Sequence, residues 1–167
     1  MYHYFANEKN YDILTRLIIQ LPRVTNGGVF LTITSTFFHQ IVLFYRPFET
    51  KLNAVLAQHN LHRAQWATLY YLEKNDSMTL VELADLQGVE KPTVSRTVAK
   101  LIASGLLTTI ETQDKRQKRL ILTPSGQALY QAVRIPIDEF ETAVMAGVSE
   151  DKQLEMIELL QSLREKI

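Results

Sequence analysis

The sequence predicts a mainly α-helical fold with a small β-hairpin, and three observations lead to this expectation. Apolar residues recur every three or four positions along most of the chain, which is the spacing of one helix face. Strand-forming residues gather in only two short runs, Leu106–Thr112 and Arg119–Leu122. Hydrophobic residues make up 46% and charged residues 22% of the chain, a balance typical of a globular domain.

The composition also excludes several classes of protein. The chain has no cysteine, which rules out disulfide scaffolds, thiolate zinc sites and cysteine-based redox sensors. Its net charge is zero, so any attraction to nucleic acid must come from local basic surfaces. The apolar stretch Val29–Tyr45 is interrupted by polar residues and is shorter than the about 20 residues that a membrane span needs. We therefore expect a cytoplasmic protein with no membrane partner.

The N-terminal stretch, Met1–Gly28, differs from the rest of the chain and has two interpretations. A short amphipathic helix over Tyr11–Leu21, ended by Pro22, would make it an extra arm that packs on a neighbour. Alternatively, Asn-Gly-Gly is what a purine-rich ribosome-binding tract would encode, and Leu31 would then be a non-AUG start. Residues 1–30 are therefore an extension whose native status the sequence leaves open.

Two helices are expected before the central part of the chain. The first runs from Thr34 or Ser35 to about His59, and Pro47 inside it should kink or interrupt it. The second covers Arg63–Lys74.

A capping-box pattern then marks a short helix, because Thr79 is followed three residues later by Glu82. That helix ends at Leu86 or Gln87, with Gly88 as a left-handed exit. Another helix follows with Pro92 at its first position and Gly105 at its end. Its inner face is expected to consist of Val94, Val98, Leu101 and Ile102.

The two strand-like runs enclose a charged tip and therefore predict a hairpin. Thr123 then caps a helix that begins at Pro124 and reaches about Met145, with Pro136 as a point where it can break. Ser149 opens the last helix, whose apolar stripe is Leu154, Ile157, Leu160 and Leu163.

The order of short helix, Gly turn, second helix and charged hairpin, from about Thr79 to Thr123, is that of a winged helix-turn-helix. A helix fits the major groove of DNA, where base pairs present distinct donors and acceptors. The second helix has no acidic residue between Lys91 and Gly105. Its outward side chains are Lys91, Thr93, Ser95, Arg96, Thr97 and Lys100, and a second basic cluster at the hairpin tip comprises Lys115, Arg116, Lys118 and Arg119. Each cluster alone is ordinary for a solvated surface, but the two together favour binding of double-stranded DNA.

These residues resemble the MarR family of bacterial regulators over roughly Thr34–Ile167. The resemblance depends on Pro92-Thr93-Val94-Ser95-Arg96, Leu101–Leu107, Asp114-Lys115-Arg116 and Leu120–Gly126, in that order along the chain. It implies a homodimer on a pseudo-palindromic operator, and by family habit repression. Residues 31–60 and 124–167 would form the helical dimerisation region and residues 61–123 the winged helix-turn-helix. The DNA contacts expected are Lys91, Pro92, Thr93, Ser95, Arg96, Lys100, Lys115, Arg116 and Lys118, with Asp114 bracing the wing through an arginine.

The sequence also supports a dimer directly, because Phe37, Phe38, Phe44 and Tyr45 exceed what one helix buries in a small monomer.

A small aromatic or lipophilic effector would find an aromatic wall with a few polar groups in His39, Tyr45, Arg46, Trp66 and Tyr70. Core packing explains each of these residues equally well, and a regulator without an effector is an open alternative. The histidines His39, His59 and His62 lack a matching set of metal ligands, so we expect no metal and no cofactor.

Two other functional classes compete with DNA binding. An enzyme is disfavoured because no nucleophile with a base, no phosphate loop and no paired carboxylates are found. A winged helix that binds protein instead of DNA is the stronger rival, since a fold does not dictate its partner.

Overall fold

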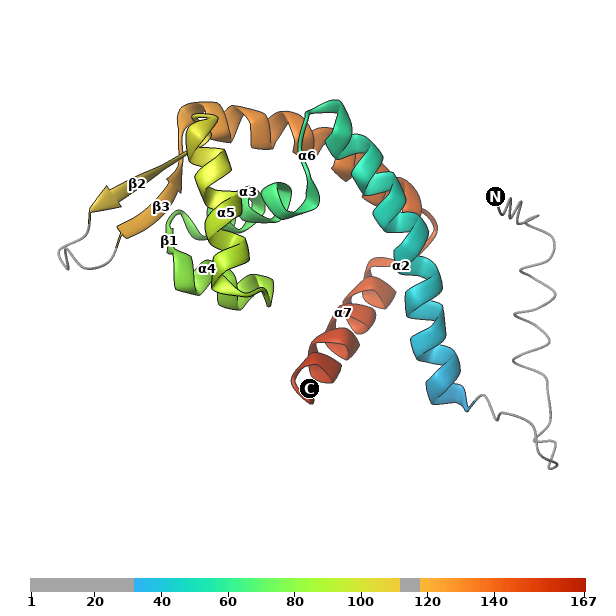
Figure 1. The fold of residues 1–167 in the computed structure, drawn as a ribbon. Coiled ribbons are helices and arrows are strands. Elements are labelled where there is room, and N and C mark those ends of the chain that lie inside the picture. The colour runs from blue at the N-terminus through green and yellow to red at the C-terminus, as the bar shows by residue number, and fades with distance from the viewer. Residues whose placement is uncertain (1–31, 112–117) are drawn as a thin grey trace, which may run out of the picture. The chain divides into compact units, whose positions relative to one another are not determined.

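The structure is a computed structural model that describes residues 32–111 and 118–167 (Figure 1). It comprises two compact units, Met1–Leu43 and Phe44–Ile167. The described part of the first unit is the beginning of helix α2 (Ile33–Gln58), which continues into the second unit. Both interpretations of Met1–Gly28 concern residues outside the described ranges and stay predictions.

Helix α2 continues through Pro47 without interruption, so of the two outcomes expected there, a kink or an interruption, the interruption does not occur. A proline inside a helix removes one backbone hydrogen bond. Packing after Pro47 offsets this loss. The ring centroids of Phe48 and Phe140 are 5.2 Å apart, and Leu56 is fully buried. The hydroxyl of Thr50 also donates to the carbonyl of Arg46 at 3.0 Å.

The helix-turn-helix consists of α3 (Arg63–Asn75), α4 (Leu80–Gln87) and α5 (Lys91–Ala103). The capping box predicted for α4 is confirmed. The Thr79 hydroxyl accepts from the amide of Glu82 at 3.2 Å, and the Glu82 carboxylate accepts from the amide of Thr79 at 2.7 Å. Gly88 has φ +61°, the left-handed exit that the sequence predicts.

The predicted hairpin is also confirmed, but the sheet has a third strand. Strands β2 (Leu107–Glu111) and β3 (Lys118–Leu122) are antiparallel, and β1 (Met78–Thr79) pairs with the other edge of β3. The strand order is therefore β1-β3-β2. The sequence did not predict β1, because two residues show no alternation and their pairing depends on β3, about 40 residues away.

Helix α6 (Pro124–Val144) joins the end of α5 through a close backbone contact. Its cap Thr123 accepts from the amide of Gly126 at 3.0 Å and donates to the carbonyl of Gly105 at 2.7 Å. A Cβ on Gly126 would lie 2.1 Å from the carbonyl oxygen of Leu106, so only glycine fits this position. The start of α6 is therefore fixed against the base of the hairpin.

Helix α6 passes Pro136 without a break. The guanidinium of Arg134 lies 2.5 Å from the Asp138 carboxylate and 2.6 Å from that of Glu141, and so bridges the residues on either side of the proline. The last helix, α7 (Glu150–Arg164), begins after Ser149 as predicted. Ser149 makes no side-chain cap hydrogen bond, and no residue of α7 is buried.

The core lies among α3, α4, α5, the sheet and α6. Trp66 of α3 stacks on Tyr130 of α6 with ring centroids 5.2 Å apart, and Leu69, Leu83 and Leu101 are fully buried. The hydroxyl of Thr68, also buried, accepts a hydrogen bond from the amide of Gln87 at 3.2 Å. The expected mainly α-helical fold with a hairpin wing is confirmed.

Candidate nucleic-acid interface

Helix α5 is anchored by one apolar stripe. Val94, Val98 and Leu101 are buried, as predicted, and face the core shared with α3 and α4. Ile102 is 41% exposed, so its assignment to the inner face is wrong. At 3.6 residues per turn Ile102 lies about 80° around the helix from Val94, whereas Leu101 lies only about 20° away.

The opposite face of α5 is open to solvent and carries the predicted side chains. The exposed residues are Lys91, Pro92, Thr93, Ser95, Arg96 and Lys100. Thr97 is only half-buried, and its hydroxyl donates to the carbonyl of Thr93 at 3.2 Å within the helix. Ala99, which the sequence reading did not single out, is exposed on this face, where its small side chain leaves room for close approach.

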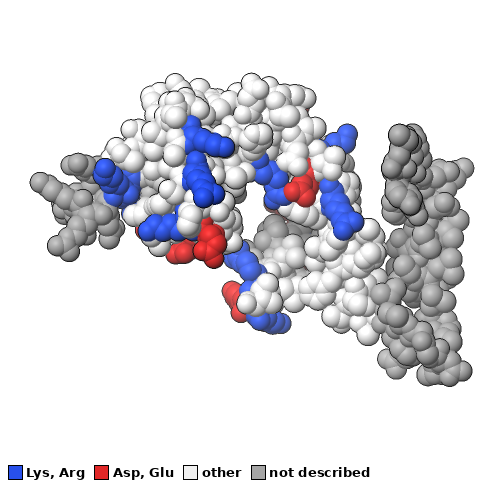
Figure 2. Space-filling view, viewed as in Figure 1, with Lys and Arg blue, Asp and Glu red and all other residues white. Residues whose placement is uncertain are grey.

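Basic side chains gather on this face of the winged helix. Figure 2 shows Lys and Arg side chains over α5 and at the start of β3, with acidic side chains beside them near α4. A positively charged, polar helix face without carboxylates suits phosphate oxygens and base edges. The arrangement of α5 is thus chemically able to bind a nucleic acid.

The wing is described only in part. Lys118, at the beginning of β3, is exposed. Lys115 and Arg116, together with the Asp114 brace expected in the wing, lie outside the described residues and stay predictions.

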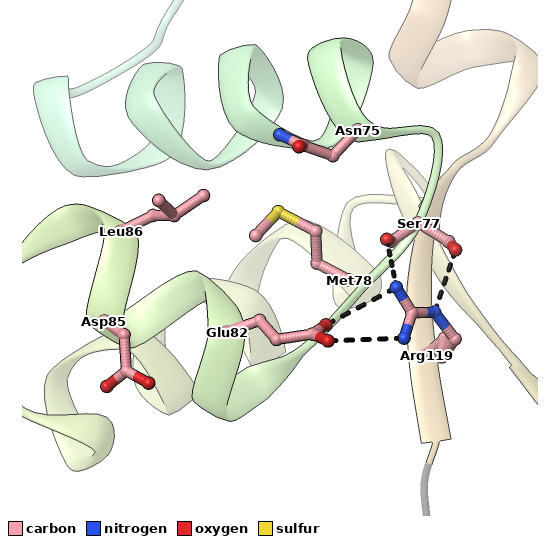
Figure 3. A pocket seen from close by; sticks show the side chains of 7 residues that line it. All are labelled: Asn75, Ser77, Met78, Glu82, Asp85, Leu86 and Arg119. Carbon is pink, nitrogen blue, oxygen red and sulfur yellow. Dashed lines mark hydrogen bonds and ion pairs between the residues drawn. The ribbon is translucent and has the colours of Figure 1, made fainter.

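Arg119 is not part of a free basic cluster, which corrects the interpretation of the hairpin tip. Its Nε donates to Ser77 Oγ at 2.9 Å and its Nη2 donates to the Ser77 carbonyl at 2.6 Å (Figure 3). The same guanidinium lies 3.4 Å from the carboxylate of Glu82. The sequence did not indicate this cluster, because Arg119 lies about 40 residues beyond Ser77 and Glu82 in the chain. Only the pairing of β1 with β3 brings them together.

Glu82 is held in its charged form by the groups around it. The hydrogen bond from the Thr79 backbone amide, followed by the Thr79 side chain and the charge of Arg119, keeps the pKa of the Glu82 carboxyl below its ordinary value. Glu82 and Arg119 line an open groove of about 430 Å³, whose other lining residues are Asn75, Ser77, Met78, Asp85 and Leu86.

The residues predicted to hold an effector have different surroundings. Trp66 is buried in the core, Tyr70 is half-buried, and Tyr45 and Arg46 are exposed. His39 is exposed and belongs to the other unit, Met1–Leu43. The binding of an effector by these five residues therefore stays a prediction.

Tyr45 has a partner that the sequence did not indicate. The guanidinium of Arg63 lies over its ring at 5.4 Å from the centroid and forms an ion pair with Glu49. Partial burial lowers the pKa of Arg63, but the hydrogen bond to Glu49 and the contact with Tyr45 outweigh it, so the pKa is raised. The cluster links the second half of α2 to the first turn of α3.

The described residues offer neither a membrane-spanning helix nor a cluster of metal ligands. Within residues 32–111 and 118–167, no helix is both long and apolar enough to cross a membrane. Over the same ranges, no group of three or more acidic, histidine or cysteine side chains is placed to hold a metal ion.

Comparisons with known proteins agree with this architecture. A sequence model of the MarR family matches residues 59–118. An HTH-type transcriptional regulator of Staphylococcus aureus is 33% identical over 136 residues, which cover 80% of this chain and 93% of the relative.

Solved structures give the same result. The structure of Staphylococcus aureus MarR in complex with salicylate and kanamycin is 33% identical, with a TM-score of 0.72, and covers 80% of this chain and 91% of that chain. A mutant of Staphylococcus aureus MepR bound to an oligodeoxyribonucleotide is 26% identical, with a TM-score of 0.55, and covers 78% of this chain and 96% of that chain. The chain, with its helix-turn-helix and hairpin, belongs to the MarR family of transcriptional regulators.

Proposed function

We propose that this protein is a sequence-specific regulator that binds double-stranded DNA as a homodimer, represses transcription and is released by a small organic ligand. The observation that carries the proposal is the exposed face of α5. Lys91, Arg96 and Lys100 are exposed there, and no carboxylate interrupts the helix. The family membership and the DNA-bound MepR relative support the same conclusion.

The side chains of α5 divide into two roles in this proposal. Thr93, Ser95 and Arg96 would meet base edges in the major groove, where hydroxyl and guanidinium groups can discriminate bases. Lys91 and Lys100 would neutralise phosphates, and Pro92 sets the first turn of the helix that presents them.

The wing would supply the second contact. Lys118 is exposed at the beginning of β3. Lys115 and Arg116 continue this basic sequence, and an arginine inserted in a narrow minor groove is favoured by the negative potential there.

A second copy of the chain would complete the DNA-binding unit. Phe44 of α2 and Ile157 and Leu160 of α7 are each at least half-exposed, and apolar surface of this kind supports an interface with a second copy. A two-fold dimer would present two α5 helices about one helical turn of DNA apart, matching a pseudo-palindromic operator.

The effector in this proposal is a small aromatic or lipophilic compound. The salicylate complex of a 33% identical relative supports this class of ligand. His39, Tyr45, Arg46, Trp66 and Tyr70 remain the candidate contacts. Such a ligand would release DNA only if it binds one arrangement of the dimer better than the other.

Salt-dependent binding to a duplex tests the proposal. The affinity of the wild-type protein should fall steeply with salt, with a log–log slope of about −0.9 per phosphate contact. Lys100→Ala should reduce the magnitude of that slope by about one. Lys152→Ala, which removes the same charge from α7, should leave the slope unchanged.

A salt-independent affinity would instead support the protein-binding alternative. Selection of bound sites from a random duplex pool should recover an inverted repeat. Recovery of a single half-site would contradict the dimeric arrangement.

A further inference from the structure

We propose that Arg119 is a positioning residue that fixes the wing relative to α4 and α5, and that it does not itself contact DNA. The inference rests on the proposed DNA-binding function, because it concerns how the wing reaches the duplex. It assigns different roles to adjacent basic residues of β3, Lys118 and Arg119.

The first connection is to the turn between α3 and β1. The Nε and Nη2 atoms of Arg119 donate to the hydroxyl and the carbonyl oxygen of Ser77 at 2.9 and 2.6 Å. Ser77 is itself fixed, because its amide donates to the carbonyl of Asn75 at 2.5 Å across Asp76. Asp76 has φ +56°, a conformation that a non-glycine residue adopts only in a tightly determined turn. The guanidinium therefore binds a well-defined backbone segment.

The second connection is to the first turn of α4. The Arg119 guanidinium lies 3.4 Å from Glu82 Oε2, and that oxygen also accepts from the Thr79 amide at 2.7 Å. Thr79 lies directly opposite Arg119 in the β1–β3 register. Backbone pairing and side-chain contacts thus join the same wing strand to the cap of α4. Helix α4 in turn packs on α5, and its Leu83 is buried in the core.

The chemistry of these contacts requires the planar fork of arginine. Its separate nitrogens reach Ser77 Oγ, the Ser77 carbonyl and Glu82 at the same time (Figure 3). A lysine ammonium places all its donors on one nitrogen and cannot reproduce this geometry, although it keeps the charge. The Arg119 side chain is 30% exposed and its donors point to protein acceptors, whereas Lys118 is exposed. The Arg119→Lys variant therefore keeps the positive charge but loses the forked contacts that position the wing.

The test compares Arg119→Lys, Arg119→Ala and Lys118→Ala in the full chain. Amide hydrogen exchange of β2 and β3 is measured without DNA, and affinity is measured by fluorescence anisotropy with a duplex. Both Arg119 variants should exchange faster in β2 and β3 while α5 stays protected. Both should also bind the duplex about tenfold more weakly than the wild type. Lys118→Ala should weaken binding and flatten the salt response, with no change in exchange.

A double variant gives the sharpest readout. If Arg119 positions the wing, Lys118→Ala should cost little further affinity in the Arg119→Lys background, because the wing contact is already lost. Wild-type affinity for Arg119→Lys would overturn the inference, since charge alone would then suffice. Unchanged exchange in β2 and β3, even with a lower unfolding midpoint, would also overturn it. If the wild type bound no duplex, the proposed function would fail. Faster amide exchange of β2 and β3 in the Arg119 variants would still support the positioning role of Arg119.

Discussion

The winged helix and helix α7 carry similar apolar spacing but bury it to different extents. In the winged helix, Leu83 and Leu101 are 0% exposed, whereas Ile157 and Leu160 of α7 are each 50% exposed. The first region covers its apolar residues with other parts of the same chain. The comparison shows that apolar periodicity predicts which residues share a helix face but not what covers that face.

The difference has an energetic consequence. Full burial of a leucine or isoleucine side chain stabilises a protein by about 1.5–3 kcal/mol. The exposed side chains of α7 therefore retain a sizeable driving force for association, and several large apolar side chains exposed on one helix favour an interface. Under the proposed function, a second copy of the chain covers it.

The largest expected effect comes from shortening one leucine in each region. Leu101→Ala should lower the free energy of unfolding by about 2–5 kcal/mol, because it leaves a cavity in a closed core. The loss should not depend on protein concentration. Leu160→Ala is the matched change in α7, and its cost should grow as the protein is concentrated. Urea unfolding at two concentrations measures both, and equal, concentration-independent losses would remove the distinction between the regions.

A charge on the α7 surface tests its partner more directly. Leu160→Glu should weaken self-association by roughly 100-fold, about 2.7 kcal/mol, because each copy would bury a carboxylate at the interface. Sedimentation should then show monomers at concentrations where the wild type is dimeric. Glu158→Gln, on the opposite side of the same helix, should leave the dimer intact. A wild-type protein that sediments as a monomer would contradict the proposal for α7.

Local signals made most of the helix boundaries predictable. The Thr79–Glu82 capping box, the Gly88 exit and the Thr123 cap each depend on residues within three or four positions, so one sequence window contains the whole interaction. Of the two outcomes expected at Pro47, a kink or an interruption, the interruption does not occur, because the packing of Phe48 and Leu56 outweighs the local preference of proline.

The candidate site was predictable only where it depends on periodicity. The exposed face of α5 follows from helical spacing. Ile102 was assigned to the buried face because it is apolar, although it lies outside the stripe that the core covers. The role of Arg119 could not be predicted, because a basic residue in a charged hairpin looks the same whether it meets solvent, phosphate or Ser77. Strand β1, which creates this cluster, exists only through pairing with β3.

Helix caps provide a smaller test of the same comparison. Thr79 accepts a hydrogen bond at the start of α4, whereas Ser149 makes no side-chain cap hydrogen bond at the start of α7. Thr79→Ala should therefore lower the free energy of unfolding by about 1 kcal/mol. Ser149→Ala should change it by less than about 0.5 kcal/mol. Chemical denaturation of the two variants measures the difference, and equal costs would show that the cap contributes nothing specific to the winged helix.

The smallest effect expected is the pH dependence of the α4 cap. Because the folded protein lowers the pKa of Glu82, the carboxylate stabilises the fold above the pKa of the unfolded chain, about 4.3. This stabilisation is lost as the pH falls through the lower folded value. Glu82→Gln should therefore destabilise the protein at pH 7 by less than about 0.5 kcal/mol, since the side chain is half-exposed and screened. The difference from the wild type should shrink below about pH 4. A difference that is constant from pH 7 to pH 3 would mean that the glutamate acts at the cap through its shape and hydrogen bonds, with no contribution from its charge beside Arg119.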